Sequence, residues 1–216
     1  MTDPCALSSD LMVAALSGLS HFAPTDADQR VVLQGIPWRD YLSLSDLFVD
    51  RAGLHLTYVE GTLEIMTTSP RHERIKTLIA RLLELHALLR GVPITGFGSA
   101  TYRREEKERG LEPDECYCVG GEKPYPDLAI EVVLTSGGVN KLAVYEGLGV
   151  REVWFWEEGT FSVFELSAAG YAPRPGSAFF PSLDFGRLAQ LVAMPDQDEA
   201  VRAYFAELNA SPASPR

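Results

Sequence analysis

Two acidic residues stand where the surrounding sequence predicts buried β-strands. Glu131 lies inside the apolar run 128–134, and Asp114 lies at the start of the run 114–119. An unpaired charge in such a strand costs several kcal/mol of folding free energy or must be neutralised. Glu131 therefore needs a partner, and a metal ion, a lysine or an arginine would serve.

The spacing of Asp114 and Glu131 predicts that the two side chains lie close together in the sheet. A strand from Asp114, a turn over residues 120–126 and a returning strand through Glu131 would form an antiparallel pair with both carboxylates at one sheet edge. With the main-chain carbonyl of Val132 and waters, they make the oxygen-only shell that Mg²⁺ prefers, and Mn²⁺ is also possible. Asp127, four residues before Glu131, would share its face of the strand. These four residues are the candidate metal ligands.

A metal ion held there would have a chemical use. It would lower the pKa of a bound water molecule and neutralise the charge that builds up on a phosphodiester. Lys141 follows the glycine-rich break after the strand and could reach back towards Glu131 to orient the attacking water. Glu73 and His72, in the first turn of a preceding helix, could border the same cleft. Asp114, Glu131, Lys141 and Glu73 are therefore the catalytic candidates.

Each of these residues also has a structural interpretation. Asp114 and Asp127 both follow a proline at a loop-to-strand boundary, where aspartate commonly caps a turn. Glu131 could form a buried ion pair with an arginine, and Lys141 could be a solvated helix lysine. Glu73 is favoured near a helix N-terminus by the helix dipole alone.

The clearest element that could position these residues is a helix. Ser69 stands at its N-cap position with Pro70 as the first helical residue, and Gly91 stands at its end. Apolar residues recur at helical spacing between them, and His86 falls on the same face. The pattern predicts a long helix with one face packed on a sheet.

The strands are predicted from alternation and turn signals. Residues 60–61 and 158–159, both Glu-Gly, predict β-hairpins. Segment 94–104 is predicted as one strand, 105–113 as a charged loop, and 1–22 as weakly helical at best. Strands and helices interleave, which favours an α/β (α+β) fold with a mixed central β-sheet flanked by helices.

The bulk composition excludes several classes of protein. The 216-residue chain carries a net charge of −11 with a pI near 4.8, so it would not coat nucleic acid by overall charge. Cys5, Cys116 and Cys118 lack the spacing of a zinc or redox pair and fit a reducing cytoplasm. Asp3 stands where a signal peptide would be positive, and no apolar run approaches the roughly 20 residues of a membrane span. We expect a cytoplasmic protein without membrane contact.

Four stretches of the chain resemble a known bacterial family and follow one another in the same order. They are GTLEIMTTSPRHERIKTLIARLL, GSATYRREEKERGLEPDECYCV, PDLAIEVVLTSGGVNKLAVYEGLGVREVW and the hairpin FSVFEL. They are similar to the Uma-two family, or domain of unknown function 820, which is assigned to the PD-(D/E)XK, restriction-endonuclease-like nuclease superfamily. The likeness covers about Val31 to Phe185, and the third stretch is its most specific part.

The resemblance implies both a fold and an activity. The fold is a restriction-endonuclease-like core, and the activity is Mg²⁺-dependent hydrolysis of phosphodiester bonds in DNA. By position, Asp114 matches the strand-borne aspartate of the superfamily, Glu131 its metal-binding acid and Glu73 its helical acid. Asp127 belongs to the family's second Pro-Asp pair.

The sequence departs from the superfamily pattern at Val133, where the lysine of the E-x-K element would stand. Within the family, a lysine further along is the natural substitute, and here that residue is Lys141. We expect an N-terminal extension over residues 1–30, a restriction-endonuclease-like domain over 31–193, and a C-terminal helix and tail over 194–216.

Three functions stay open at the level of the sequence. The first is an endonuclease acting on DNA, for which a homodimer would supply two active sites to cut both strands. The second is a non-catalytic binding or regulatory module of nuclease fold, and the third is a phosphoesterase for small phosphorylated molecules, which the low positive charge suits. Convergence of Asp114, Glu131 and Lys141 would favour the first or third, and an arginine pair at Glu131 the second.

Overall fold

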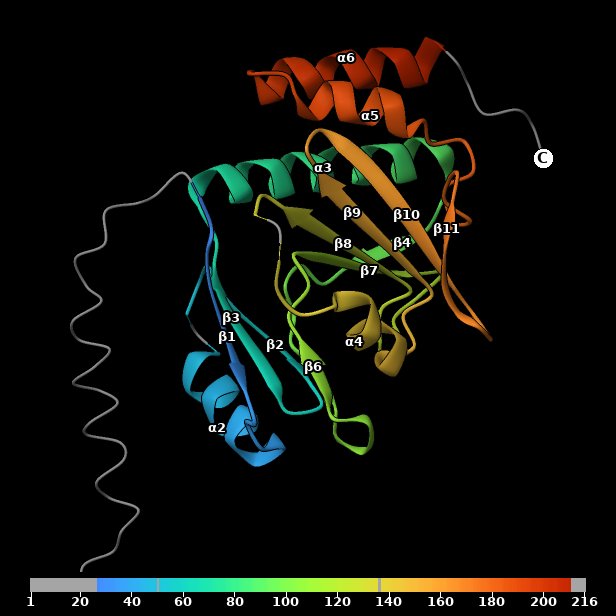
Figure 1. The fold of residues 1–216 in the computed structure, drawn as a ribbon. Coiled ribbons are helices and arrows are strands. Elements are labelled where there is room, and N and C mark those ends of the chain that lie inside the picture. Colours follow the sequence, from blue (N-terminus) through green and yellow to red (C-terminus); the bar gives the residue numbers. More distant parts are fainter. Residues whose placement is uncertain (1–26, 50, 136, 211–216) are drawn as a thin grey trace, which may run out of the picture.

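The computed structural model describes residues 27–49, 51–135 and 137–210, and in them the chain forms helices and two β-sheets (Figure 1). The mixture confirms the expected α/β (α+β) class, and it is consistent with the expected restriction-endonuclease-like core. The expected single central sheet is accompanied by a second sheet of five strands. Cys5 and the segment 1–22, expected to be weakly helical at best, lie outside the described residues.

The larger sheet has six strands in the order β11-β10-β9-β8-β7-β4. Strands β8 and β9 are parallel, whereas all other neighbours are antiparallel. The connection from β8 to β9 must therefore cross the sheet, and helix α4 lies in that crossover. The bounds are β4 Ile94–Gly96, β7 Glu115–Val119, β8 Leu128–Val133, β9 Glu152–Glu157, β10 Thr160–Ser167 and β11 Gly170–Arg174.

The smaller sheet is antiparallel and runs in the order β1-β3-β2-β6-β5. Its hairpin of β2 and β3 confirms the turn expected at residues 60–61, where Glu60 and Gly61 have φ angles of 43° and 84°, as a two-residue hairpin turn requires. Helix α2 (Trp38–Phe48) packs on this sheet. The bounds are β1 Gln29–Gln34, β2 Leu54–Val59, β3 Thr62–Thr67, β5 Tyr102–Arg104 and β6 Arg109–Leu111.

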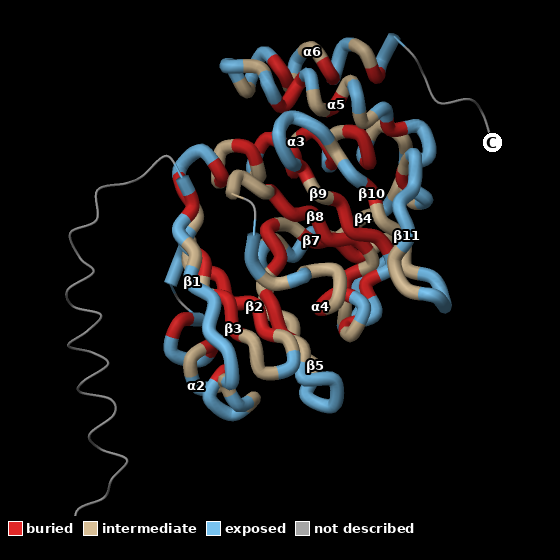
Figure 2. Tube along the Cα trace, in the orientation of Figure 1, coloured by how far each residue is buried: buried red, intermediate tan, exposed pale blue. Residues whose placement is uncertain are grey.

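Helix α3 (Pro70–Arg90) confirms the long helix expected after Ser69. The Ser69 side chain accepts a hydrogen bond from the backbone N–H of His72, and Gly91 ends the helix with a φ of 66°. The apolar face of α3 packs on the larger sheet, and helices α5 (Phe185–Val192) and α6 (Gln197–Ala210) pack over α3. Helix α4 (Lys141–Leu148) lies on the opposite face of the sheet (Figure 1). The central strands are therefore buried on both faces (Figure 2).

Two expectations for the segment 94–113 are wrong. The single strand expected over 94–104 is split, since β4 pairs with β7 in the larger sheet and β5 pairs with β6 in the smaller one. Gly98, with a φ of 57°, lies at the change of direction between them. The expected charged loop contains a short 3₁₀ helix, η1 (Glu105–Lys107), and the strand β6. Three-residue strands are too short to show an alternating pattern.

Both ends of the described chain belong to the fold, since β1 pairs with β3 and α6 packs on the core. Strand β1 begins at Gln29, and helix α6 contacts both α3 and α5. The predicted domain boundaries at residues 30 and 193 stay a prediction. Among the helices of the described residues, none combines the length and the apolar character that a membrane crossing requires.

Candidate active site

Asp114 and Glu131 lie beside each other on two neighbouring strands. Strands β7 and β8 pair antiparallel with Glu115 opposite Ile130, so the register places Asp114 opposite Glu131. Both side chains are buried, with 1% and 0% of their surface exposed. The partners of each acid therefore decide its charge.

Glu131 is held by two residues of helix α4. Lys141, the first residue of α4, donates a hydrogen bond from Nζ to Glu131 Oε2 over 2.5 Å, and Tyr145 donates its hydroxyl to Oε1. Burial raises the pKa of Glu131 to about 7, although the charge of Lys141 opposes this rise. Burial lowers the pKa of Lys141, but the charges of Glu131 and Asp114 outweigh burial and raise it. Lys141 is therefore a cation held against a buried carboxyl group whose pKa is raised.

Asp114 has one oxygen engaged and one oxygen without a partner. Oδ2 accepts a hydrogen bond of 2.7 Å from the backbone N–H of Val132 and lies 3.1 Å from Nε2 of His72. Oδ1 is buried and has no hydrogen-bond partner among the described residues. Burial raises the pKa of Asp114, but the close contact with His72 and the charge of Lys141 outweigh it and hold the pKa well below its usual range. Asp114 is thus ionised, with one buried oxygen that no described residue satisfies.

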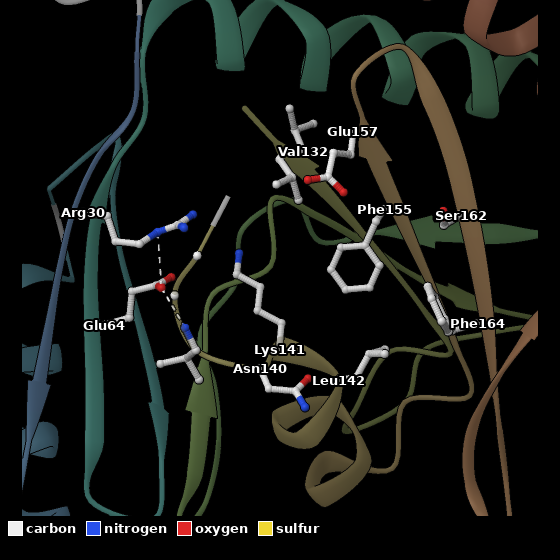
Figure 3. A pocket seen from close by; sticks show the side chains of 14 residues that line it. Arg30, Glu64, Val132, Asn140, Lys141, Leu142, Phe155, Glu157, Ser162 and Phe164 are labelled. Atoms are coloured by element: carbon white, nitrogen blue, oxygen red, sulfur yellow. Dashed lines mark hydrogen bonds and ion pairs between the residues drawn. The ribbon is translucent and has the colours of Figure 1, made fainter. Parts of the chain in front are cut away.

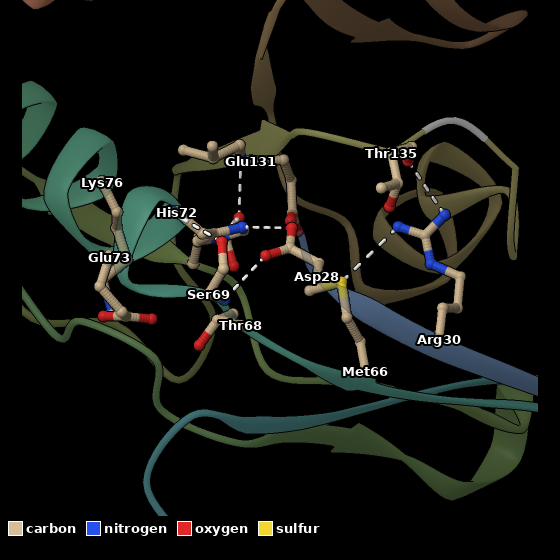
Figure 4. Close-up of polar contacts among 12 residues, drawn as sticks. Asp28, Arg30, Met66, Thr68, Ser69, His72, Glu73, Lys76, Glu131 and Thr135 are labelled. Atoms are coloured by element: carbon tan, nitrogen blue, oxygen red, sulfur yellow. Dashed lines mark hydrogen bonds and ion pairs between the residues drawn. The ribbon is translucent and has the colours of Figure 1, made fainter. Parts of the chain in front are cut away.

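His72 contacts both Asp114 and Asp28, and Figure 4 shows it beside Asp28 and Ser69 near the beginning of the described chain. Its Nδ1 lies 2.8 Å from Asp28 Oδ2, and Asp28 Oδ1 accepts the backbone N–H of Ser69 over 2.8 Å. Burial lowers the pKa of His72, but its close contact with the carboxylate of Asp114 and its hydrogen bond with Asp28 outweigh burial and raise the pKa to about 9. His72 is therefore a buried cation between two carboxylates, and it fixes the orientation of Asp114.

A second polar pair fastens the segment before helix α4 to the smaller sheet (Figure 3). Glu64 of β3 accepts the backbone N–H of Val139 over 3.0 Å. Arg30 of β1 lies 3.3 Å from Glu64 and donates to the carbonyl of Thr135 over 3.2 Å. Gly138 leaves room for this pair, because a Cβ there would lie 2.1 Å from Glu64 Oε2. The pair therefore sets where α4 begins.

Glu73 is the catalytic candidate that lies on helix α3. Its carboxylate binds the ammonium of Lys76 over 2.6 Å. Burial raises the pKa of Glu73, but the hydrogen bond from Lys76 outweighs burial and lowers it. Successive helix side chains point about 100° apart, and the α3 residue that reaches Asp114 is His72. The role of Glu73 as the helical acid stays a prediction, and His72 is the α3 residue that contacts Asp114.

Asp127, a candidate metal ligand, lies at the opposite end of β8 from Glu131. Four residues span about 13 Å of strand, so a shared face does not bring the two carboxylates together. Asp127 accepts the N–H of Val119 over 2.8 Å and the ammonium of Lys123 over 2.6 Å, which ties the turn between β7 and β8. Val132 enters the site through its N–H to Asp114, and the metal-binding role of its carbonyl stays a prediction.

Tyr145 and Asp28 are site residues that the sequence analysis missed. The position of Tyr145, four residues after Lys141 on the same helix face, is a signal that could have found it. Asp28 belongs to the predicted extension 1–30 and carries no motif. Its role follows only from the packing of β1 beside the start of α3.

The carboxylates of Asp114 and Glu131 fit a Mg²⁺ ion that is bound by few protein ligands. Among the described residues, no group of three or more His, Cys, Asp and Glu side chains is placed to hold a metal ion. Mg²⁺ usually keeps several waters and binds through one or two carboxylates plus substrate phosphates. Asp114, with its unpartnered Oδ1, suits this mode directly. Glu131 would have to release Lys141 or Tyr145 to join it, since both of its oxygens are engaged.

Comparison with known families agrees with the resemblance seen in the sequence. A family model described as Uma2, putative restriction endonuclease, matches residues 38–194, which is most of the chain. The matched stretch includes Asp114, Glu131 and Lys141 but not Asp28. No curated protein matches the chain.

Proposed function

Because the chain belongs to the Uma2 family of putative restriction endonucleases, we propose that it is a Mg²⁺-dependent endonuclease that hydrolyses phosphodiester bonds in DNA. The observation that carries this proposal is the contact of Lys141 with Glu131 beside the ionised, half-engaged Asp114. We also propose a cytoplasmic location, which the free thiols of Cys116 and Cys118 suit.

The site residues would divide the chemistry among them. Asp114 and Glu131 would hold Mg²⁺, which when bound lowers the pKa of a water molecule and neutralises charge on the phosphate. His72 and the N–H of Val132 keep Asp114 in one orientation before substrate arrives. Such preorganisation means that the site need not rearrange as charge develops in the transition state.

Lys141 would act as the catalytic cation. When Glu131 turns to the metal, the ammonium of Lys141 can donate to the attacking water or to a phosphate oxygen. Val133, at the position of the superfamily lysine, lines the same cleft as Lys141, so the helix lysine reaches the space that the missing strand lysine would have entered. This geometry supports Lys141 as its substitute.

Two observations bear on the alternatives. Glu131 is bonded to Lys141 and Tyr145, whereas the non-catalytic module was expected to hold it with an arginine. The net charge of −11 keeps a phosphoesterase for small phosphorylated molecules as the second candidate. The homodimer stays a prediction, which light scattering at micromolar protein would test.

A cleavage assay tests the proposed function. Purified protein is incubated with plasmid, single-stranded DNA, RNA and a small phosphomonoester, in Mg²⁺, Mn²⁺ or EDTA. The proposal expects metal-dependent cleavage of DNA that Glu131→Gln abolishes. Hydrolysis of the phosphomonoester alone would support the second candidate. Cleavage of none of them, or cleavage unaffected by Glu131→Gln, would contradict the proposal.

A further inference from the structure

A cleft opens beside Lys141 on the part of the larger sheet that α4 leaves uncovered (Figure 3). Its volume is about 380 Å³, and small-molecule sites span roughly 300–1,000 Å³. Lys141 stands between an aromatic wall, formed by Phe155 and Phe164, and a polar wall, formed by Arg30 and Glu64. A substrate whose phosphate reaches Lys141 must therefore place its neighbouring groups against these walls.

The aromatic wall lies on the same face of the sheet as the strand acids. Phe155 of β9 pairs with Glu131 in the parallel register, so both side chains project to one side. Phe164 of β10 packs against Phe155 with ring centroids 5.8 Å apart and planes at 82°. Both rings are only half-buried. Two aromatic rings, packed edge to face, thus lie next to a charged centre.

The charges of the cleft do not suit a long duplex. Arg30 is paired with Glu64, and Lys141 is paired with Glu131. Duplex binding depends on Lys and Arg contacts to several phosphates. Single-strand binding draws much of its affinity from bases stacked on aromatic rings, and a base can stack on a protein ring only when it has left its duplex.

We propose that this cleft binds the base of an unpaired nucleotide, stacked on Phe155, beside the phosphodiester held at Asp114 and Glu131. The inference rests on the proposed function and narrows its substrate to single-stranded or locally unpaired nucleic acid. Asn140 and Ser162, which also line the cleft, offer hydrogen-bond donors and acceptors to the edge of the base.

A binding experiment with oligonucleotides of equal charge tests the inference. Fluorescence anisotropy in Ca²⁺ gives the Kd of the full chain for labelled oligothymidylate, for a fully abasic strand of the same length, for single-stranded RNA and for a DNA duplex. We expect oligothymidylate to bind about ten-fold or more tightly than the abasic strand and the duplex. If the RNA binds as tightly as oligothymidylate, the site accepts an unpaired base of either nucleic acid. If the RNA binds more weakly, the site is specific for unpaired DNA.

Variants locate the effect on the ring. Phe155→Leu should raise the Kd for oligothymidylate about ten-fold and leave the abasic strand unchanged. Phe164→Leu provides a second test should Phe155→Leu fail to fold. The matched control is Phe205→Leu on α6, where the ring is 50% exposed and lies outside the cleft. This control should bind like the wild type.

The inference and the proposed function can fail separately. Equal Kd values for oligothymidylate and the abasic strand, or no binding of any oligonucleotide, would overturn the inference. Metal-dependent cleavage of duplex DNA at the wild-type rate by Phe155→Leu would also overturn it while supporting the nuclease. Base-dependent binding through Phe155 without cleavage of any substrate would support the base site and contradict the nuclease.

Discussion

The two ends of helix α3 place the same residue type in opposite environments. His72, in the first turn, lies between the carboxylates of Asp28 and Asp114 and has a pKa raised to about 9. His86 lies fourteen residues further along, close to four helical turns, and therefore faces the same way. Both are buried, with 0% and 1% of their surface exposed.

His86 is held by neutral partners. Its Nδ1 lies 2.7 Å from the hydroxyl of Tyr204, and its Nε2 lies 3.2 Å from the hydroxyl of Ser182. Burial lowers the pKa of His86 to about 4, and the charge of Arg90 adds to this effect. The imidazole at this end is neutral, and it joins α3 to the C-terminal helix α6.

The difference shows that burial alone does not decide what a helix histidine does. Burial acts in the same direction at both ends of α3, since it lowers the pKa of His72 as well as that of His86. The carboxylates brought by β1 and β7 reverse the outcome at His72. One end of the helix is thus part of a charged centre, and the other is part of the core.

His72→Leu should have the largest effect on stability. It removes the cation between Asp28 and Asp114, so the free energy of unfolding should fall by ~3–5 kcal/mol. Urea denaturation at pH 7 in EDTA measures this loss. Adding Asp28→Asn should restore part of it, because one of two repelling carboxylates is gone. A loss of only about 1 kcal/mol, the value of one neutral hydrogen bond, would mean that His72 is uncharged.

Lys141→Met at the charged end should lower the rate of DNA cleavage by ~100-fold or more, the scale of one preorganised electrostatic donor. His86→Leu should leave the rate per folded molecule unchanged, since His86 lies in the core. Adding Val133→Lys to Lys141→Met should restore part of the activity. Single-turnover cleavage under Mg²⁺ gives these rates. A Lys141→Met protein that cuts at the wild-type rate would make this lysine a structural partner of Glu131.

His86→Leu should cost less stability than His72→Leu. It leaves the hydroxyls of Tyr204 and Ser182 without their partner, and an unsatisfied group costs ~1–3 kcal/mol. The double variant His86→Leu/Tyr204→Phe should lose little more free energy of unfolding than His86→Leu alone. The second substitution removes the hydroxyl that the first leaves without a hydrogen-bond partner. Urea denaturation of the four proteins gives the cycle. Strictly additive losses would show that His86 and Tyr204 do not interact.

The smallest expected effect is in the pH dependence of the free energy of unfolding. The slopes contributed by His72 and His86, at the two ends of α3, should have opposite signs. Because the pKa of His72 is raised, its stabilising contribution to the free energy of unfolding is fully present below pH 6.5. That contribution is lost as the pH rises through about 9. The lowered pKa of His86 makes stability fall as the pH drops from 6.5 towards about 4, because the unfolded chain binds a proton that the folded chain does not. Each slope is at most about 1.4 kcal/mol per pH unit.

Denaturation of the wild type and both leucine variants across the pH range isolates the two contributions. The stability gap between wild type and His72→Leu should narrow from pH 7 to pH 10. The gap between wild type and His86→Leu should narrow from pH 7 to pH 4. Gaps that narrow in the same direction would contradict the assignment of a charged imidazole to His72 and a neutral one to His86.

Much of the fold could be predicted because its signals are local. The Ser69 cap, Pro70 and Gly91 predict the bounds of α3, and the pairs at 60–61 and 158–159 predict their hairpins. The split of segment 94–104 between two sheets could not be predicted, since partner choice for three-residue strands depends on the whole fold.

The candidate site divides in the same way. Asp114 and Glu131 stand out because an acid breaks the pattern of a buried strand, and Lys141 stands out by resemblance. His72 shows the same helical periodicity as His86, so sequence alone does not separate a charged site histidine from a core one. Asp28 and Asp114, both more than forty residues away in the chain, make that distinction.

The central claim is that the charged end of α3 and the strands beside it form a metal site. The most direct measurement is the melting temperature in millimolar Mn²⁺ and in EDTA, for wild type, Asp114→Asn and Asp127→Asn. A ligand that binds only the folded state stabilises it by RT ln(1 + [L]/Kd). We expect Mn²⁺ to raise the melting temperature of wild type and Asp127→Asn but not of Asp114→Asn. Equal melting temperatures of the wild type with and without Mn²⁺ would contradict the claim.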